Sequence, residues 1–184
     1  MRIIAGKYKS RRLLAPPGTE TRPTSDRLRE TLFNVVAPAV EGSVWFDLFA
    51  GTGAVGIEAL SRGARTVYFV ESSARAAKTI RGNLAALEIN DGAKIMEHEA
   101  MTALRMLDVE GVSCDFCFLD PPYRKMGDYE RVLGFLSQST LVKPQGQIIA
   151  EHDKHFDPGD VFGFLRRRRT LRQGDAVLSF YVRE

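Results

Sequence analysis

A glycine-rich turn within residues 44–56 (VWFDLFAGTGAVG) could hold a ligand at the end of an apolar strand. Gly51 and Gly53 let the backbone and a ligand approach each other without a Cβ between them. Glu71 ends the next apolar run, and a carboxylate there can accept hydrogen bonds from both hydroxyls of a ribose. Asp47 places a second carboxylate below the turn, where an ammonium group could lie. This spacing predicts a site for a nucleoside-containing cofactor with a positively charged group.

The same turn leaves two other interpretations open. Together with Gly56, its glycines satisfy the G-x-G-x-x-G fingerprint of dinucleotide-binding proteins, so a nicotinamide-dependent oxidoreductase is one alternative. Asp47 argues against that alternative because its carboxylate would repel a pyrophosphate. The 184 residues also leave little room for a separate substrate domain. A glycine turn with a purely structural role is the second alternative.

A second motif, Asp120-Pro121-Pro122-Tyr123, follows a later apolar run. Its two prolines fix φ and remove two donors, which leaves a rigid loop that presents hydrogen-bond acceptors. Asp120 and a proline carbonyl could hold the N–H groups of an aromatic amine and favour the pyramidal geometry that exposes its lone pair. Tyr123 could stack on the base. The motif therefore predicts methylation of an exocyclic amino nitrogen of a nucleic-acid base by alignment with a sulfonium donor, without a metal. A simple strand-ending Asp-Pro turn is the structural alternative.

Alternating periods along the chain predict an α/β fold in which the two motifs share one crevice. Apolar strands are expected at 44–49, 66–70, 94–97, 115–119 and 147–150, with helices between them at 54–61, 74–87, 102–107 and 129–137. Repeated β-α-β units form a parallel sheet covered by helices on both faces, and such sheets bind ligands at the carboxyl ends of their strands. Two further strands, 167–171 and 177–182, should form a hairpin through Gln173-Gly174-Asp175.

The N-terminal part of the chain is predicted to form a basic arm followed by a helix. Residues 1–22 suggest an irregular or hairpin-like arm, and a helix should begin near Thr24, Ser25 or Asp26 and end before Pro38. One face of that helix carries Leu28, Leu32, Phe33 and Val36. We expect residues 1–40 to form an extension that contacts nucleic acid and residues 41–184 to form the catalytic domain.

Charge is unevenly distributed along the chain. Residues 1–40 carry +5 and residues 162–184 carry +4, whereas residues 41–161 carry −6. Two basic ends around an acidic centre are typical of a protein that contacts a polyanion. In a strand, the run Arg166–Arg169 would place alternate side chains on one face. The arginines expected to contact nucleic acid are Arg22, Arg27, Arg29, Arg166 and Arg168. A local Arg27–Glu30 ion pair is the alternative for Arg27.

Other patterns exclude several classes of protein. Cys114 and Cys117 lie in an apolar run and are interpreted as buried strand thiols, neither a redox pair nor half of a zinc site. His152 and His155 are interpreted as polar loop residues, and no metal site is predicted. No apolar run approaches the length of a membrane span, and the first residues lack the apolar core of a signal peptide. The expected location is the cytoplasm.

The segments Arg2-Ile3-Ile4-Ala5-Gly6 and 22–34 (RPTSDRLRETLFN) narrow the interpretation further. With the turn after Asp47 and the Asp-Pro-Pro-Tyr motif, they make nearly the whole chain resemble the RsmD family of 16S ribosomal RNA guanine-N2 methyltransferases. The resemblance implies a Rossmann-like class I methyltransferase fold with a seven-stranded, mainly parallel sheet, an antiparallel C-terminal strand and helices on both faces. It also implies 16S rRNA as substrate, within an assembling small ribosomal subunit, and a monomer is expected.

The resemblance also assigns roles to individual residues. It implies that S-adenosylmethionine is the cofactor and S-adenosylhomocysteine its product. Asp120, Pro121, Pro122 and Tyr123 would hold the guanine. The cofactor would be bound by Asp47, Phe49, Gly51, Gly53, Glu71, Glu99 and Ala100. Glu99 and Ala100 lie where related enzymes contact the adenine, usually with Asp or Asn.

Two alternatives of other kinds remain. An adenine-N6 methyltransferase acting on DNA would use the same motifs, but the sequence shows no DNA-recognition domain. An RNA-binding assembly factor could retain the fold without activity. A methylation assay that compares ribosomal subunits with duplex DNA distinguishes these alternatives.

Overall fold

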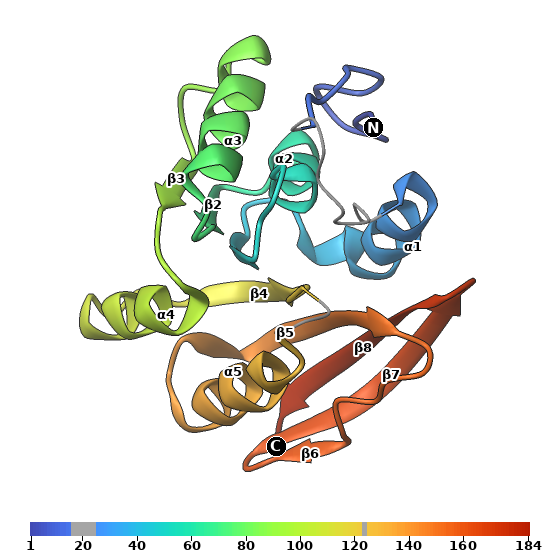
Figure 1. The fold of residues 1–184 in the computed structure, drawn as a ribbon, viewed down its shortest axis with the longest axis vertical. Helices are drawn as coiled ribbons and strands as arrows, with labels where there is room; N and C mark the ends of the chain where they lie inside the picture. The colour runs from blue at the N-terminus through green and yellow to red at the C-terminus, as the bar shows by residue number, and fades with distance from the viewer. Residues whose placement is uncertain (16–24, 123–124) are drawn as a thin grey trace.

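The computed structural model of the protein describes residues 1–15, 25–122 and 125–184, and one eight-stranded sheet runs through that part of the chain (Figure 1). The strands are β1 (Val44–Leu48), β2 (Thr66–Val70), β3 (Ala93–Met96), β4 (Cys114–Leu119), β5 (Val142–Asp153), β6 (Val161–Phe162), β7 (Leu165–Gln173) and β8 (Ala176–Arg183). The helices are α1 (Asp26–Val36), α2 (Ala54–Ser61), α3 (Ala74–Ala86), α4 (Ala100–Val109) and α5 (Gly127–Gln138), with a short 3-10 helix η1 (Ala37–Ala39) after α1.

The strand order is β3-β2-β1-β4-β5-β8-β7-β6, and the first five strands are parallel. β8, β7 and β6 are antiparallel to their neighbours, which confirms the doubly wound sheet with an antiparallel C-terminal part. The described residues form eight strands where seven were expected, because the two-residue strand β6 pairs with the start of β7. β5 also begins earlier than predicted, since Lys143-Pro144-Gln145 interrupts the apolar pattern in its first half.

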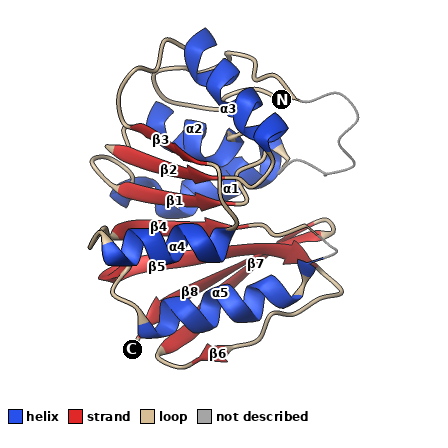
Figure 2. Cartoon of the chain, turned by 60° about the vertical axis from the view of Figure 1, so that its left-hand side comes forward, coloured by secondary structure: helices blue, strands red, loops and turns tan. Residues whose placement is uncertain are grey.

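Alternating side chains of the strands divide the core into two layers. Trp45 and Phe118 face the layer formed with α1, α2 and α3, whereas Phe46 and Leu119 face the layer formed with α4 and α5. Figure 2 shows α4 and α5 lying in front of the strands, on the same side of the sheet. Both faces of the parallel part are therefore buried, as such a sheet requires.

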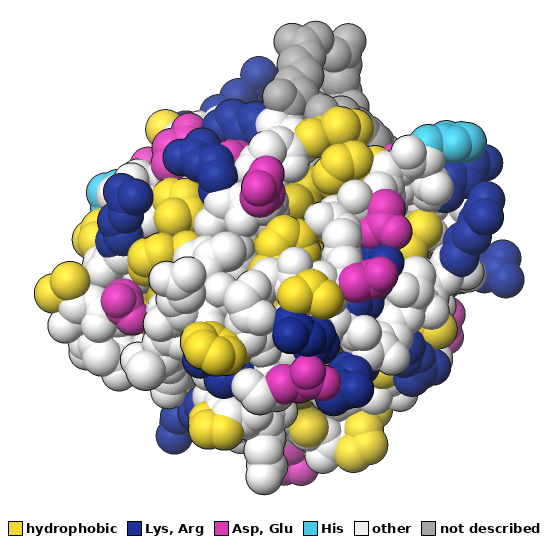
Figure 3. All heavy atoms as spheres, turned by 90° about the horizontal axis from the view of Figure 1, so that it is seen from below, with side chains coloured by type: hydrophobic (Ala, Val, Ile, Leu, Met, Phe, Trp, Pro, Cys, Tyr) yellow, Lys and Arg dark blue, Asp and Glu magenta, His cyan; other side chains and the backbone are white. Residues whose placement is uncertain are grey.

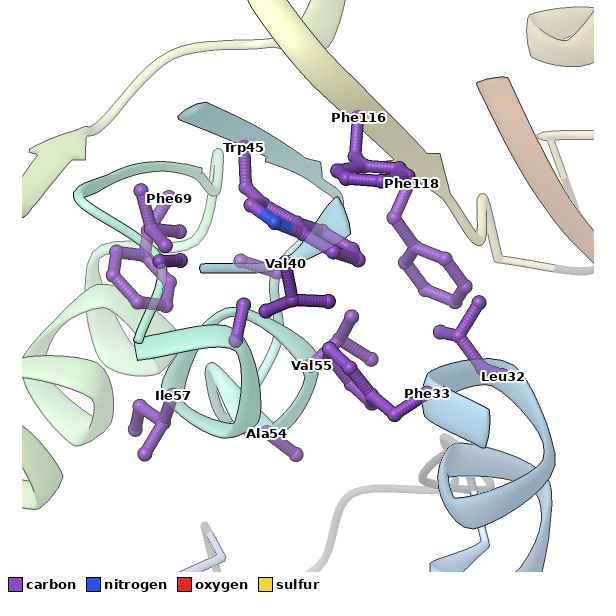
Figure 4. Close-up of a cluster of buried hydrophobic side chains, with 14 of the residues drawn as sticks. Leu32, Phe33, Val40, Trp45, Ala54, Val55, Ile57, Phe69, Phe116 and Phe118 are labelled. Atoms are coloured by element: carbon purple, nitrogen blue, oxygen red, sulfur yellow. The ribbon is translucent and has the colours of Figure 1, made fainter. Parts of the chain in front are cut away.

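Aromatic side chains fill the layer beneath α1. Trp45 stacks on Phe33 and on Phe116, with ring centroids 5.2 and 4.6 Å apart, and its Nε1 donates to Ser43 Oγ at 2.8 Å (Figure 4). The hydroxyl of Ser25 caps α1 by accepting from the backbone N of Leu28, as one of the predicted caps would. Residues 1–40 therefore pack into the same core as the sheet. Their separation from the catalytic domain at residue 40 stays a prediction about their role.

The first thirteen residues form the predicted hairpin-like arm. The backbone N of Ile3 donates to the carbonyl of Arg11, and that of Ser10 donates to the carbonyl of Ile3, both at 2.9 Å. Ile3 and Leu13 are buried in the core. Fully buried Glu58 of α2 accepts hydrogen bonds from the backbone N of Ile4 and Ala5 at 2.8 and 3.0 Å. The arm is therefore attached to α2 through its backbone.

The C-terminal strands form the predicted hairpin. Gln173 pairs with Ala176 across a two-residue turn in which Gly174 has φ 62°. Among the described residues, no helix combines the length and apolar character needed to cross a membrane.

Candidate active site

A cavity of about 570 Å³ opens where β1, β2, β4 and β5 end. Its size is typical of small-molecule sites, and its position is the edge at which doubly wound sheets bind ligands. The two motifs singled out in the sequence meet there. The predicted site residues that line the cavity are Asp47, Phe49, Gly51, Glu71, Glu99, Ala100, Asp120, Pro121 and Pro122.

The turn after β1 depends on left-handed backbone at three positions. Phe49, Gly51 and Gly53 have φ of 63°, 56° and 77°, and a non-glycine residue such as Phe49 in this region is typical of binding sites. Among the described residues, a Cβ on Gly51 would meet only the Phe49 carbonyl, at 3.9 Å, so the turn is open on its cavity side. Gly53 instead is buried, and its backbone N donates to the Ala50 carbonyl at 2.7 Å. Gly53 therefore stabilises the turn through this backbone hydrogen bond, on the side away from the cavity.

Glu71 connects the end of β2 to this turn. Its Oε2 accepts from the backbone N of Gly51 and its Oε1 from that of Ser73, both at 2.8 Å. A carboxylate has about four lone-pair positions, so each oxygen can still accept another hydrogen bond. The carboxylate is therefore held in one orientation at the cavity wall, where it can bind a diol.

Asp47 lies beneath the turn and is only 1% exposed. Its Oδ2 accepts from the backbone N of Gly56 at 2.9 Å, in the first turn of α2. Burial raises the pKa of Asp47 to about 8, with a smaller contribution from Glu71, while the hydrogen bond from Gly56 lowers it. A cationic group in the cavity would favour the charged carboxylate. Asp47 thus stabilises the start of α2 and also places an ionisable carboxyl group beneath the cavity.

Gly56 has a packing role. A Cβ at this position would lie 2.3 Å from Cε1 of Phe69 and 2.7 Å from Cγ1 of Val67. Glycine here lets α2 approach β2 closely, which is the role of the third glycine in a G-x-G-x-x-G turn. The third glycine of the G-x-G-x-x-G pattern is therefore needed here for the packing of α2 on β2 and not for contact with a ligand.

Asp120 follows β4 at the other side of the cavity. Leu48 and Leu119 are register partners, so the turn after β1 and the Asp-Pro-Pro segment leave neighbouring strands at the same level. Burial raises the pKa of Asp120, and the carboxylates of Glu151 and Asp47 raise it further. Pro121 is buried and Pro122 is exposed. Tyr123 lies outside the described residues, so its predicted stacking role stays a prediction.

Glu99 and Ala100 occupy the predicted loop after β3. Glu99 is exposed, and both its carboxylate oxygens bind Nζ of Lys125, at 3.2 and 3.0 Å. This ion pair connects the start of α4 with the segment after the Asp-Pro-Pro motif. Ala100 is 5% exposed and begins α4. The predicted contact of Glu99 with an adenine would therefore compete with Lys125.

Sequence reasoning missed several cavity residues beyond Asp120. Glu151 and the aromatic residues Tyr129 and Phe156 line this end, and the Tyr129 hydroxyl donates to the Glu151 carbonyl at 2.5 Å. His152, weighed only as a metal ligand or loop residue, is buried and its Nε2 lies 2.9 Å from Ser179 Oγ. Glu151 follows the apolar run 147–150, so the strand-end rule that identified Glu71 could have identified it.

The predicted RNA contacts in the N-terminal part have different positions. Arg27 is exposed on α1, whereas Arg22 lies outside the described residues. The prediction for Arg29 is wrong, because its side chain is 0% exposed and donates to the Arg2 carbonyl and to Asp26 Oδ1, at 2.5 and 2.9 Å. A buried guanidinium cannot touch RNA directly. Arg29 stabilises the packing of the arm against α1.

The C-terminal arginines separate as alternation predicts. Arg166 and Arg168 both pair with Glu184, while Arg167 pairs with Asp157 and Asp160. A register shift between Arg167 and Arg169 interrupts the pairing with β8. On the face drawn in Figure 3, several Lys and Arg side chains lie directly beside acidic ones. Positive charge on the two predicted RNA-binding residues of β7 is therefore partly compensated.

Cys114 and Cys117 are buried free thiols on β4, which confirms their interpretation as strand residues. Burial raises the pKa of Cys114, and a hydrogen bond with Cys117 raises it further. In the described parts of the chain, no cluster of three or more potential ligands is arranged to hold a metal.

The doubly wound sheet, its antiparallel C-terminal strands and the cavity at the strand ends define an α/β protein with the class I methyltransferase fold. The solved structure of yhhF from Escherichia coli matches it with a TM-score of 0.87 and 30% identity, covering 100% of this chain and 98% of that chain. Ribosomal RNA small subunit methyltransferase D of Escherichia coli K12 is 35% identical, over 100% of this chain and 90% of the relative. YlbH of Bacillus subtilis is 35% identical over 98% of both chains.

The family model described as "conserved hypothetical protein 95" matches residues 1–182. The chain belongs to this family, which is the RsmD family that the sequence motifs indicated.

Proposed function

We propose that this protein transfers the methyl group of S-adenosylmethionine to the exocyclic N2 amino group of a guanine in 16S rRNA, within an assembling small ribosomal subunit. One observation carries the proposal: the turn after β1 and the Asp120-Pro121 segment after β4 line a single cavity. Relatives named ribosomal RNA small subunit methyltransferase D give the substrate class.

The cavity residues fit this cofactor. The open side of Gly51, the carboxylate of Glu71 held by two backbone N–H groups, and Asp47 on the floor suit a nucleoside that also carries an ammonium group. SMU.776, a more distant protein that shares the fold with a TM-score of 0.66 and 14% identity, was solved in complex with SAH. When bound, S-adenosylmethionine supplies a methyl group attached to a sulfonium, and the electrons of the methyl–sulfur bond stay on sulfur when the methyl group is transferred.

Asp120 and Pro121 orient the amino group that accepts the methyl. Asp120 Oδ and the Pro121 carbonyl accept hydrogen bonds from its two N–H groups, and they direct its lone pair toward the cofactor end of the cavity. That lone pair would form the new C–N bond as the bond between the methyl carbon and sulfur breaks, and the nitrogen would then release one proton to solvent. Alignment of this kind lowers a barrier by several kcal/mol, up to about 7–11 in ideal cases.

The far end of the cavity favours guanine over adenine. Asp120, Glu151 and Asp153 line it, and their carboxylates are hydrogen-bond acceptors when ionised. On its Watson–Crick side, the N2 amino group of guanine lies beside a second donor, N1–H. The corresponding edge of adenine places an acceptor, N1, beside its amino group, and that acceptor would face carboxylates. Donor-rich guanine is therefore the better partner for an acceptor-rich wall.

Asp120→Ala tests the catalytic part of the proposal. We expect it to abolish methylation of small ribosomal subunits from cells that lack the protein, while S-adenosylhomocysteine still binds in calorimetry. Asp108→Ala on the exposed part of α4 is the matched control and should methylate as the wild type does. Unchanged turnover of Asp120→Ala, label incorporated only into duplex DNA, or binding of NAD without binding of S-adenosylmethionine would each refute the proposal.

Neutralising Arg27, Arg166 and Arg168 tests the RNA-binding part. Each phosphate contact that is lost should reduce the slope of log K against log salt by about 1, because fewer counterions are released. Arg105→Gln on α4 is the control. If the triple variant keeps both the affinity for 16S rRNA and its salt slope, these arginines do not bind RNA.

A further inference from the structure

Asn83 connects three backbone groups from two distant segments of the chain. This residue of α3 is 1% exposed. Its Oδ1 accepts from the backbone N of Leu14 at 2.7 Å, and its Nδ2 donates to the carbonyls of Leu14 and Thr52 at 3.1 and 3.0 Å. One buried amide thus binds the end of the N-terminal arm and the centre of the glycine turn.

Both segments border the cavity. Thr52 lies between Gly51 and Gly53 and lines the cavity, and so does Ala15, the residue after Leu14. Three hydrogen bonds hold the turn: the backbone N of Gly51 donates to Glu71, the backbone N of Gly53 donates to the Ala50 carbonyl, and Asn83 donates to the Thr52 carbonyl. Of these, only the bond from Asn83 links the turn directly to the arm.

Elsewhere the arm is fastened to α2 near its start, and Nη2 of Arg11 donates to the carbonyl of Ala86 at the end of α3 at 2.9 Å. Glu58 binds Ile4 and Ala5, and Ser61 Oγ accepts from the backbone N of Tyr8 at 3.0 Å. Glu58 and Ser61 belong to α2, which begins at Ala54, directly after Gly53 at the end of the same turn. The arm therefore contacts the turn's helix at one end and the turn itself, through Asn83, at the other.

We propose that Asn83 is a positioning residue that couples RNA binding by the N-terminal part of the chain to cofactor binding in the turn. The proposal rests on the proposed function, because it takes S-adenosylmethionine and 16S rRNA as the two ligands. A ligand that fixes the turn also fixes Thr52, and through Asn83 it fixes Leu14 and Ala15. Coupling of this kind is reciprocal, so RNA must strengthen cofactor binding by the same factor as the cofactor strengthens RNA binding.

Only an amide meets all three requirements at this position. An aspartate of the same shape could accept from Leu14, but it has no N–H for the carbonyls of Leu14 and Thr52 and would place negative charge against both. Alanine removes all three bonds without this repulsion. Asn83→Asp should therefore disturb the turn and the arm more than Asn83→Ala does.

Calorimetry with S-adenosylhomocysteine and a binding assay with 16S rRNA, each on the full chain, test the coupling. We expect Asn83→Ala to bind S-adenosylhomocysteine about tenfold more weakly and Asn83→Asp more weakly still. In the wild type, saturating S-adenosylhomocysteine should tighten RNA binding several-fold, and in both variants this factor should fall to about one.

Two controls separate positioning from general destabilisation. Asn90→Ala replaces an exposed asparagine between α3 and β3 and should leave both affinities unchanged, and Val132→Ala creates a cavity under α5 on the opposite face of the sheet. Val132→Ala should lower the stability of the protein but keep the coupling factor. The inference is overturned if both Asn83 variants bind S-adenosylhomocysteine as the wild type does, if the wild type shows no coupling, or if Val132→Ala loses it equally. Failure of the wild type to bind S-adenosylhomocysteine would instead refute the proposed function.

Discussion

Replacement of Gly56 by alanine tests the close approach of α2 to β2. The added Cβ would lie 2.3 and 2.8 Å from Cε1 and Cζ of Phe69 and 2.7 Å from Cγ1 of Val67. Real Cβ contacts of that length do not occur, so α2 or β2 must move. Phe69 and Val67 are both fully buried, which leaves the strand little freedom to do so.

The expected magnitude follows from two opposing effects. Alanine has a helix propensity about 1 kcal/mol better than glycine, which favours the variant. Overpacking a buried contact costs about 1–3 kcal/mol, and contacts this short indicate the upper part of that range. We therefore expect a net destabilisation of about 2 kcal/mol. For a chain of this length that corresponds to a Tm about 4–8 °C lower.

Urea unfolding and thermal melting measure this effect, and Gly82→Ala is the matched control. Gly82 is an exposed glycine of α3 at which an added Cβ would meet no atom of the described residues within 4 Å. The control should be more stable than the wild type by about 0.5–1 kcal/mol, because only the helix propensity changes. If Gly56→Ala is as stable as Gly82→Ala, the packing role assigned to Gly56 is wrong.

Three further predictions concern buried carboxyl groups. Glu58→Ala should lower the free energy of unfolding by about 2–4 kcal/mol. It should also speed hydrogen exchange at the amides of Ile4 and Ala5, because it removes their acceptor. Slow exchange at both amides would contradict this prediction. For Asp47, with a folded pKa of about 8, the free energy of unfolding should fall as pH rises from about 4 to about 8, because the unfolded chain loses a proton there that the folded carboxyl keeps. Asp47→Asn should flatten that dependence in urea titrations, and an unchanged slope would count against the assignment. Because the pKa of Asp120 is raised, kcat/KM should rise with pH as its carboxylate forms. Asp120→Asn should retain some activity without this rise. The same pH profile in the variant would exclude Asp120 as the titrating group.

Much of the fold could be predicted because the central strands β1, β2 and β4 are largely apolar runs and the helices carry regular apolar faces. The parallel order of the first five strands follows from the β-α-β alternation. The start of β5 could not be predicted in this way, because residues 143–145 are not an apolar run and lie in a register irregularity between the paired residues Val142 and Gln147. β6 has only two residues, too few for any period to be visible.

The candidate site was predictable where a motif stands at a strand end, as for Asp47, Glu71 and Asp120. Asn83 was not, because it is one polar residue in the middle of a helix and its three partners are backbone groups far away in the chain. Arg29 was assigned to RNA from charge alone. Its spacing to Leu32, Phe33 and Val36 already places it on the apolar face of α1, and helical periodicity could have corrected that assignment.

The backbone attachment of the N-terminal arm has a consequence for engineering. Ile4, Ala5, Tyr8 and Leu14 are held through their amide N–H groups, so most other residue types could replace the exposed ones without losing these bonds. Proline alone lacks the donor and would detach the chain at any of these four positions. A library that varies the outward side chains of the arm and omits proline there could therefore search for altered substrate preference while the scaffold stays folded.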